Sequence, residues 1–131
     1  MHEHLRETST QLERSSERLF VYGSLSPGLV NHHVVAKLGG TWRLGWVEGD
    51  LHEQGWGAAI GFPGVVCRAG APRVAVHILE SAELPRHWDR LDAFEGREYR
   101  RVVVPATLDD GGTVLGNIYV IRRPPERGAS S

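Results

Sequence analysis

Residues 19–28 read LFVYGSLSPG and mark the abrupt end of an apolar segment. The first four of them have the β-branched and aromatic composition of a buried strand. Glycine, serine and proline follow at once, and these residues suit sharp turns with exposed backbone. A core strand that ends in such a loop turns main-chain N–H groups toward a cavity, which is one way that proteins hold an anion. The sequence therefore predicts that this loop binds a carboxylate of a small ligand.

The length and composition of the chain favour one soluble, strand-rich domain. Its 131 residues suffice for an apolar core, and its hydrophobic content of 40% is ordinary for a globular protein. The 16 glycines and 7 prolines indicate many turns, which favours strands over a helical bundle. A net charge of −1 gives no general attraction to nucleic acid or to a membrane, so neither is an expected partner.

Cysteine usage and the N-terminal segment favour a cytoplasmic location. Cys67 is the single cysteine, so an internal disulfide is excluded and a reducing compartment fits. The first residues lack the apolar core of a signal peptide, and no apolar run reaches the length of a membrane span.

The pattern along the chain predicts an α+β domain over residues 18–124. Residues 1–17 and 125–131 are polar and are expected to form a disordered arm and a disordered tail. Residues 83–95 form the principal helix, with Pro85 in its first turn and Gly96 as its cap, and residues 29–38 form a short second helix that ends at a glycine pair. A curved or barrel-like sheet is expected from a strongly bent strand at 41–51, strands at 65–68, 73–79, 98–108 and 113–121, a loop at 55–64, and a hairpin turn at 109–112.

Glu95 lies on the apolar side of the principal helix. It follows Leu91 by four residues and Trp88 by seven, so helical spacing places all three on one stripe. A carboxylate there points toward the core or a cleft, where desolvation disfavours its charged form. The negative end of the helix dipole acts in the same direction. Both effects predict a pKa raised toward neutrality, which a general base working near pH 7 needs.

Other interpretations of the carboxylates in this region stay open. Glu98, which begins the next strand, is the reserve candidate for a catalytic carboxylate, and Asp92 is expected on the surface at the edge of the stripe. Glu95 itself would, in the alternative, turn outward at the helix end and pair with Arg97, Arg100 or Arg101.

Several motifs follow one another in a distinctive order. LFVYGSL at 19–25 is followed by Gly28, and LDAFEG at 91–96 is followed by YRR at 99–101. A GFPG turn at 61–64 and NIYV at 117–120 extend the pattern over nearly the whole domain. Together these motifs resemble the gamma-glutamylcyclotransferase-like family. The resemblance implies a small mixed β-barrel-like sheet with flanking helices and a cavity at the 22–25 loop.

The resemblance also implies a reaction and a catalytic residue. In such enzymes the position matching Glu95 is the general acid/base. The α-amine of a gamma-glutamyl compound attacks its own γ-carbonyl, which gives 5-oxoproline and a released amine or amino acid. The implied partner is therefore a small gamma-glutamyl substrate, and no cofactor is needed. The alternative is a catalytically idle module of the same fold that binds a small carboxylated ligand or a protein partner.

The substrate-binding residues are expected at the opening loop and on two later strands. The loop residues that match the family's gamma-glutamyl site are Tyr22, Gly23, Ser24 and Leu25, and the backbone N–H groups of the last three would hold the α-carboxylate. The two other tyrosines, Tyr99 and Tyr119, are expected to line the pocket or, in the alternative, to pack within the sheet.

No metal site is predicted, although the chain has seven histidines. The neighbours His32 and His33 would point in different directions on a helix, and no spacing matches a zinc motif. Cys67 sits in a strand-like run and is expected to act as a small buried hydrophobe. Trp56, flanked by glycines, is expected at the pocket rim.

Two departures from the family pattern concern the leaving-group side of the substrate. Relatives often carry Tyr-Pro where this chain has Phe62-Pro63, and Gly-Glu-Val-Tyr where this chain has VAVH at 74–77. Neither change touches the glycine loop or Glu95. The identity of the released group therefore does not follow from the family.

Overall fold

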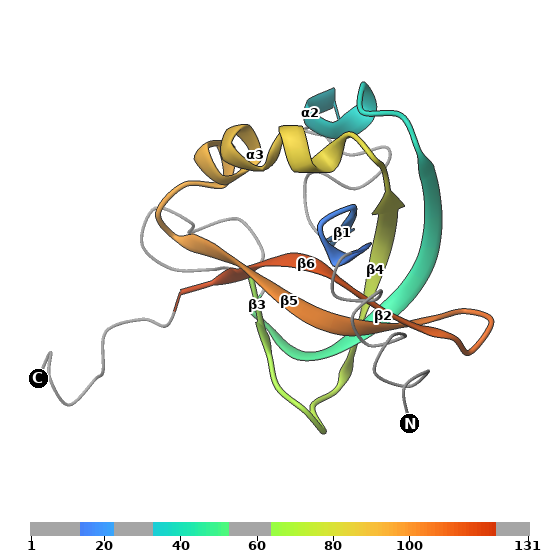
Figure 1. Ribbon diagram of the computed structural model, residues 1–131. Coiled ribbons are helices and arrows are strands. Elements are labelled where there is room, and N and C mark those ends of the chain that lie inside the picture. The colour runs from blue at the N-terminus through green and yellow to red at the C-terminus, as the bar shows by residue number, and fades with distance from the viewer. Residues whose placement is uncertain (1–13, 23–32, 53–63, 123–131) are drawn as a thin grey trace, which may run out of the picture.

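Six strands and three short helical segments make up the part of the chain that the computed structural model describes, residues 14–22, 33–52 and 64–122 (Figure 1). In chain order they are β1 (Arg18–Val21), α2 (His33–Ala36), β2 (Thr41–His52), β3 (Gly64–Cys67), β4 (Arg73–Glu80), the 3-10 helix η2 (Leu84–Arg86), α3 (Trp88–Glu95), β5 (Tyr99–Leu108) and β6 (Thr113–Ile121).

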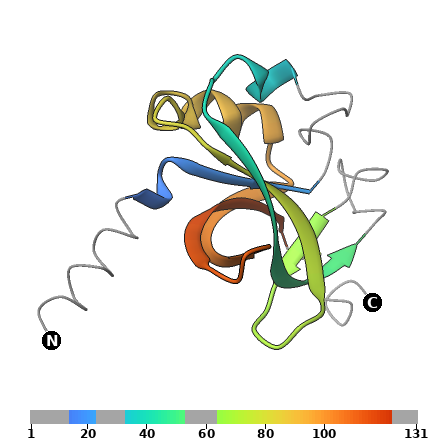
Figure 2. The same ribbon diagram turned by 90° about the vertical axis from the view of Figure 1, so that its right-hand side faces the viewer.

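Five of the strands close into a small mixed barrel. Their order is β2-β4-β1-β6-β5, and β5 pairs back onto β2 through Gly45 opposite Leu108 and Trp46 opposite Thr107. The pairing of β1 with β6 is parallel, whereas β1–β4, β2–β4, β2–β5 and β5–β6 are antiparallel. The strand β3 pairs with the far end of β2. The predicted α+β fold with a barrel-like sheet is confirmed, and the strands wrap around a central space beneath the helices (Figure 2).

The barrel closes where β2 passes close to β5, at a glycine. A Cβ atom at Gly45 would lie 2.6 Å from the carbonyl oxygen of Thr107 and 2.8 Å from Cδ1 of Ile78. A side chain at this position would therefore push the two strands apart. The glycines that interrupt the bulky residues of β2 thus serve the strong bend that the sequence predicts.

Alternating residues of β1 face two separate apolar cores. Leu19 and Val21 face outward into a layer covered by the helices, whereas Phe20 points into the barrel. The outer core contains Leu19, Val21, Val35, Leu38, Leu79, Leu84, Trp88, Leu91 and Tyr119. The inner core contains Phe20, Val47, Val65, Val74, Val76, Ile78, Ala106, Leu108, Ile118 and Val120. Figure 1 shows α2 and α3 together on one side of the strands, where they cover the outer core.

The predicted helix over residues 83–95 is divided into two pieces. Its first turn closes through bonds of the 3-10 type, in which the N–H of Arg86 donates to Glu83 at 3.1 Å and that of His87 donates to Leu84 at 2.8 Å. His87 has φ −116° and ψ −1°, and α3 begins only at the next residue. Gly96 then ends α3 with φ +82°, as predicted for its cap.

Residues 14–17, which the sequence places in a disordered arm, contact the domain. The carbonyl oxygen of Ser15 accepts a hydrogen bond from Nδ2 of Asn117 at 2.8 Å, and that of Ser16 accepts one from Nε1 of Trp88 at 2.9 Å. The ordered domain therefore extends before residue 18. The polar composition of these residues gave no sign of the contact, because their carbonyl oxygens can accept hydrogen bonds whatever side chains they carry.

No helix within the described residues is long and apolar enough to cross a membrane.

Candidate active site

Glu95 ends α3 at a point where tyrosines from three strands converge. Tyr22 directly follows β1, Tyr99 opens β5 and Tyr119 lies in β6. Burial raises the pKa of each of these tyrosines, and the nearby Glu95 carboxylate raises each one further. The fold thus brings the predicted carboxylate together with all three tyrosines that the sequence assigns to the site.

The carboxyl group of Glu95 is partly buried, and its pKa lies near neutral pH. Burial raises its pKa from the ordinary 4.5 to about 7, the direction that its helical position predicts. The alternative pairing with Arg101 is wrong, because that guanidinium binds Asp92 instead. Within the described ranges, neither Arg97 nor Arg100 forms an ion pair with Glu95. A carboxyl group with this pKa can take up and release a proton near pH 7.

The hydroxyl of Tyr22 forms hydrogen bonds that join strands. It donates its proton to the carbonyl oxygen of Tyr119 at 2.6 Å and accepts a hydrogen bond from the backbone N–H of Val65 at 3.1 Å. These contacts join the end of β1 to β6 and β3. Any contact of Tyr22 with a substrate would therefore rely on its ring rather than on a donated proton.

The hydroxyl of Tyr119 also forms a hydrogen bond, in this case to a carboxylate on α3. It donates to Oδ1 of Asp92 at 2.6 Å, and Arg101 donates to the same carboxylate from Nε at 2.9 Å and from Nη2 at 3.4 Å. Burial by itself would raise the pKa of Asp92, but the hydrogen bonds from Arg101 and Tyr119 and the charge of Arg101 lower it on balance. Asp92 therefore stays ionised near neutral pH.

The prediction that Asp92 lies on the surface agrees with its exposure, but its carboxylate also joins α3 to two strands. Its side chain is 43% exposed, yet it binds groups from both β5 and β6. Sequence reasoning missed this role because the partners lie 9 and 27 residues further along the chain. The available signal was spacing, since Asp92 precedes Glu95 by three residues and so lies on a neighbouring part of the helix surface.

Three of the predicted substrate-binding residues, Gly23, Ser24 and Leu25, lie outside the described residues. So do Trp56, which is expected at the pocket rim, and His32, Phe62 and Pro63. Tyr99 is partly buried against the outer core. Cys67 packs against the inner core, and burial raises the pKa of its thiol, which matches the role of a small hydrophobe. Within the described ranges, no three His, Cys, Asp or Glu side chains lie together as a metal site would need.

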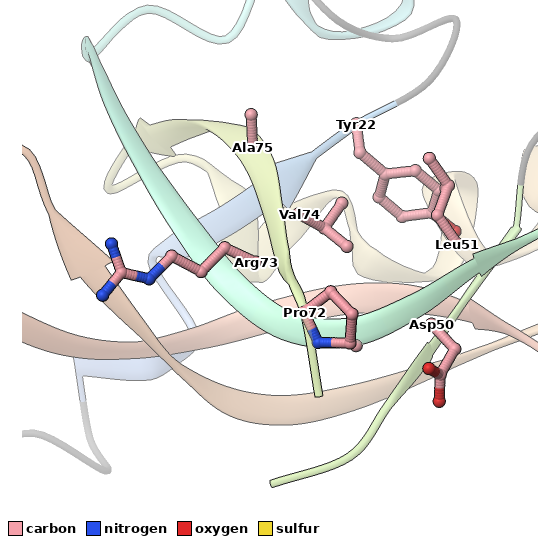
Figure 3. Close-up of a pocket in the computed structure, with 8 residues that line it drawn as sticks. Tyr22, Asp50, Leu51, Pro72, Arg73, Val74 and Ala75 are labelled. Atoms are coloured by element: carbon pink, nitrogen blue, oxygen red, sulfur yellow. The ribbon is translucent and has the colours of Figure 1, made fainter. Parts of the chain in front are cut away.

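An open groove of about 530 Å³ begins beside Tyr22 (Figure 3). The two charged side chains on its wall are already engaged: Asp50 pairs with Arg68 at 2.9 Å, and the guanidinium of Arg73 lies 4.1 Å from the ring centre of Trp46. The wall that remains is mainly apolar. Its lining residues are Tyr22, Gly49, Asp50, Leu51, Pro72, Arg73, Val74 and Ala75. In Figure 3, Arg73 extends away from the side of the groove where Tyr22 and Leu51 are drawn.

A family model described as gamma-glutamyl cyclotransferase, AIG2-like, matches residues 19–131. The chain belongs to this family. The match extends from β1 past the end of β6 and so includes both the opening loop and Glu95. The comparison with curated proteins gave no match.

Solved structures of similar proteins share the fold of this family member. YkqA from Bacillus subtilis is 27% identical with a TM-score of 0.63, over 81% of this chain and 36% of YkqA. An AIG2-like protein from Mus musculus is 21% identical with a TM-score of 0.61, over 83% of this chain and 79% of that one. A protein titled gamma-glutamyl cyclotransferase is 15% identical with a TM-score of 0.59, over 81% of this chain and 66% of that one. The chain thus spans about a third of YkqA but most of the mouse protein.

Proposed function

We propose that this protein is a gamma-glutamylcyclotransferase that releases 5-oxoproline from a gamma-glutamyl compound. The observation that carries the proposal is the carboxyl group of Glu95, which is partly buried, has a pKa raised to about 7 and acts electrostatically on three tyrosines. Membership of the family supports it. A module that only held a ligand would gain nothing from a desolvated carboxyl group at this point.

The proposed reaction removes two protons from the substrate amine and exchanges one C–N bond for another. A free α-amine has a pKa of about 8, so the substrate amine is largely protonated at neutral pH. The Glu95 carboxylate removes a proton from this amine, whose nitrogen then attacks the γ-carbonyl carbon. The ring C–N bond forms, and the attacking nitrogen gives up its second proton to water from the tetrahedral intermediate. Glu95 then passes the first proton to the leaving nitrogen as the C–N bond to that nitrogen breaks. The products are 5-oxoproline and a free amine or amino acid.

Holding the substrate in a folded-back conformation supplies much of the rate enhancement in this proposal. Alignment of two reacting groups can contribute up to about 7–11 kcal/mol. The backbone N–H groups of Gly23, Ser24 and Leu25 are proposed to hold the α-carboxylate. This grip would place the α-amine between Glu95 and the γ-carbonyl carbon.

The groove beside Tyr22 supports a proposal for the leaving group. The groove is much larger than a small amine needs, and its charged groups are already paired. An aliphatic chain would fill the space along Leu51 and Val74. We therefore expect released amines with an extended apolar stem to be preferred over ammonia or methylamine.

The test of this function is release of 5-oxoproline from a panel of gamma-glutamyl compounds. The purified protein is incubated with gamma-glutamyl amino acids, glutathione and a series of gamma-glutamyl alkylamines of increasing chain length, and 5-oxoproline is quantified by chromatography. Turnover is expected, and KM should fall as the alkyl chain lengthens. If no compound is turned over but some raise the melting temperature, the protein is a binding module instead.

The pH dependence of stability offers a prediction that needs no substrate. Burial raises the pKa of Glu95 in the folded state to about 7, so between pH 4.5 and 7 the folded protein binds a proton that the unfolded chain has released. Stability contributed by the protonated group is therefore present below pH 4.5 and is lost as the pH rises toward 7. At about 1.4 kcal/mol for each pH unit, the loss amounts to roughly 3 kcal/mol. The test is urea unfolding of wild type and Glu95→Gln at pH 5, 6, 7 and 8. The free energy of unfolding of wild type should fall relative to that of the variant up to pH 7, and the difference between the two should stay constant above pH 7.

A further inference from the structure

We propose that Tyr119 is a positioning residue, whose hydroxyl joins Asp92 and Arg101 in a clamp that fixes α3 on the barrel and holds the Glu95 carboxyl group in place. We call Asp92, Arg101 and Tyr119 the α3 clamp. The kinetic part of the test rests on the proposed function, whereas the titration part stands without it.

The helix α3 needs such an attachment because it is short. It has 8 residues, and isolated helices of that length are unstable in water. Trp88 and Leu91 anchor it in the outer core, but apolar contacts alone do not prevent a helix from rotating or sliding. The α3 clamp adds directional bonds from two different strands, with the hydroxyl at 2.6 Å and the guanidinium at 2.9 Å from the same carboxylate.

Further contacts hold the guanidinium of Arg101 in its position. It lies 4.2 Å from the ring centre of Trp88, and its Nη1 donates to Oδ1 of Asn117 at 3.0 Å. Asn117 in turn donates to the carbonyl oxygen of Ser15 at 2.8 Å and is itself buried. The arginine therefore links the start of α3, the middle of α3 and β6. The side chains of Asn117 and Arg101 therefore cannot rotate or move away without breaking several hydrogen bonds.

The clamp acts on Glu95 through the helix. Glu95 lies three residues after Asp92, so a rotation of α3 that released Asp92 would move Glu95 as well. The proton of Tyr119 goes to Asp92 rather than to Glu95, although both carboxylates act electrostatically on this tyrosine. Among the described residues no side chain donates a hydrogen bond to Glu95. The two carboxyl groups are thereby kept in different protonation states near pH 7.

The charged and titratable groups around Glu95 come from every element that packs against the end of α3. The charges of Arg101 and Asp92 offset each other, because Nε of Arg101 lies 2.9 Å from Oδ1 of Asp92 in an ion pair. The tyrosines are neutral in this pH range, because burial raises the pKa of each above its ordinary value. The groups that interact electrostatically with Glu95 are Tyr22 beside β1, Tyr99 at the start of β5 and Tyr119 in β6. The charged groups of the adjoining turns are Asp92 in α3, Glu98 just before β5 and Arg101 in β5.

The experiment compares Tyr119→Phe and Arg101→Met with a matched control, Arg100→Met, which removes an exposed arginine from the neighbouring position of β5. Misplacement of a catalytic group by about 1 Å can lower a rate by about 100-fold, so kcat for release of 5-oxoproline should fall roughly 10- to 100-fold in both clamp variants. KM should change by less than about twofold, because the clamp does not touch the substrate. Arg100→Met should behave as wild type.

A titration of the Glu95 side-chain carboxyl carbon by NMR gives the second readout, with the signal assigned by its loss in Glu95→Gln. The midpoint is expected near pH 7 in wild type and in Arg100→Met. It should move toward 4.5 in the clamp variants, because a loosened α3 lets water reach the carboxyl group. The double variant Tyr119→Phe/Arg101→Met should be no worse than the more severe single variant, since both act through one contact.

The outcomes separate the clamp from the function. A raised KM with unchanged kcat in Tyr119→Phe would show that Tyr119 contacts the substrate, and this would overturn the clamp. An unchanged titration midpoint of Glu95 in folded Tyr119→Phe or Arg101→Met would also overturn it. If wild type releases no 5-oxoproline but the midpoint moves in the clamp variants, the clamp holds and the proposed function fails. Circular dichroism verifies folding, and Arg101→Met decides the question if Tyr119→Phe does not fold.

Discussion

Replacing Glu95 with glutamine is expected to lower kcat/KM for release of 5-oxoproline by a factor of about 100 to 10,000, the contribution typical of general acid–base catalysis. Glutamine keeps the size and polarity of the side chain but cannot accept the proton of the substrate amine. The loss corresponds to about 3–5 kcal/mol of transition-state stabilisation. It should appear mainly in kcat, because binding of the gamma-glutamyl group is assigned to the 22–25 loop.

The matched control for this variant is Glu98→Gln, which removes the reserve candidate three residues later. Glu98→Gln should retain turnover within a few fold of wild type. If instead Glu98→Gln is inactive and Glu95→Gln is active, the acid/base assignment moves to Glu98. Both variants should remain folded, and Glu95→Gln should be at least as stable as wild type at pH 8, since it removes a buried carboxylate.

Replacing Phe20 with alanine is expected to lower the free energy of unfolding by about 3–5 kcal/mol. Phe20 points into the barrel, where its side chain is 1% exposed and lies over Gly116. A Cβ atom at Gly116 would come within 2.5 Å of the Phe20 ring, so that glycine leaves the space that the ring fills. Loss of the ring opens a cavity that closed strands cannot collapse to fill. Urea unfolding measures the change as a lower midpoint at unchanged m-value.

The control for this core variant uses the same residue type on the surface. Phe94 in α3 is 42% exposed, and Phe94→Ala should cost about 1 kcal/mol or less. Equal losses in the two variants would mean that the interior of the barrel is not the main apolar core. A domain of this kind has a total stability of about 5–15 kcal/mol, so Phe20→Ala would remove a large part of it.

Local features of this fold were predictable because neighbouring residues decide them. The aspartates and glycines at 109–112 specify a tight turn, and the strands on either side of it pair over nearly their full length. The stripe that carries Trp88, Leu91 and Glu95 was visible from helical spacing, and so was the raised pKa of its carboxyl group. The break at His87 was not visible, because Pro85 and Leu84 are compatible with either kind of helical turn.

Polar contacts between distant segments were beyond the reach of the sequence. The Tyr22 hydroxyl bridges Tyr119 and Val65, and nothing near residue 22 indicates those partners. Asp92 was assigned to the surface because it lies at the edge of the apolar stripe, and its partners on β5 and β6 could not be foreseen from that position. The resemblance to a family predicted the site residues but not what the tyrosine hydroxyl groups bind. Such contacts depend on which strands become neighbours, which is decided only when the barrel closes.

The parallel pairing of β1 with β6 has a consequence for how the chain must be made. It joins Leu19 to Asn117 and Phe20 to Ile118, so the first strand acquires its second partner only after the last strand has been synthesised. Until then, the apolar residues of β1 lack one of the walls that bury them. A chain emerging from a ribosome therefore cannot complete this domain strand by strand, and closure is expected as one slow, non-local event after β6 has emerged.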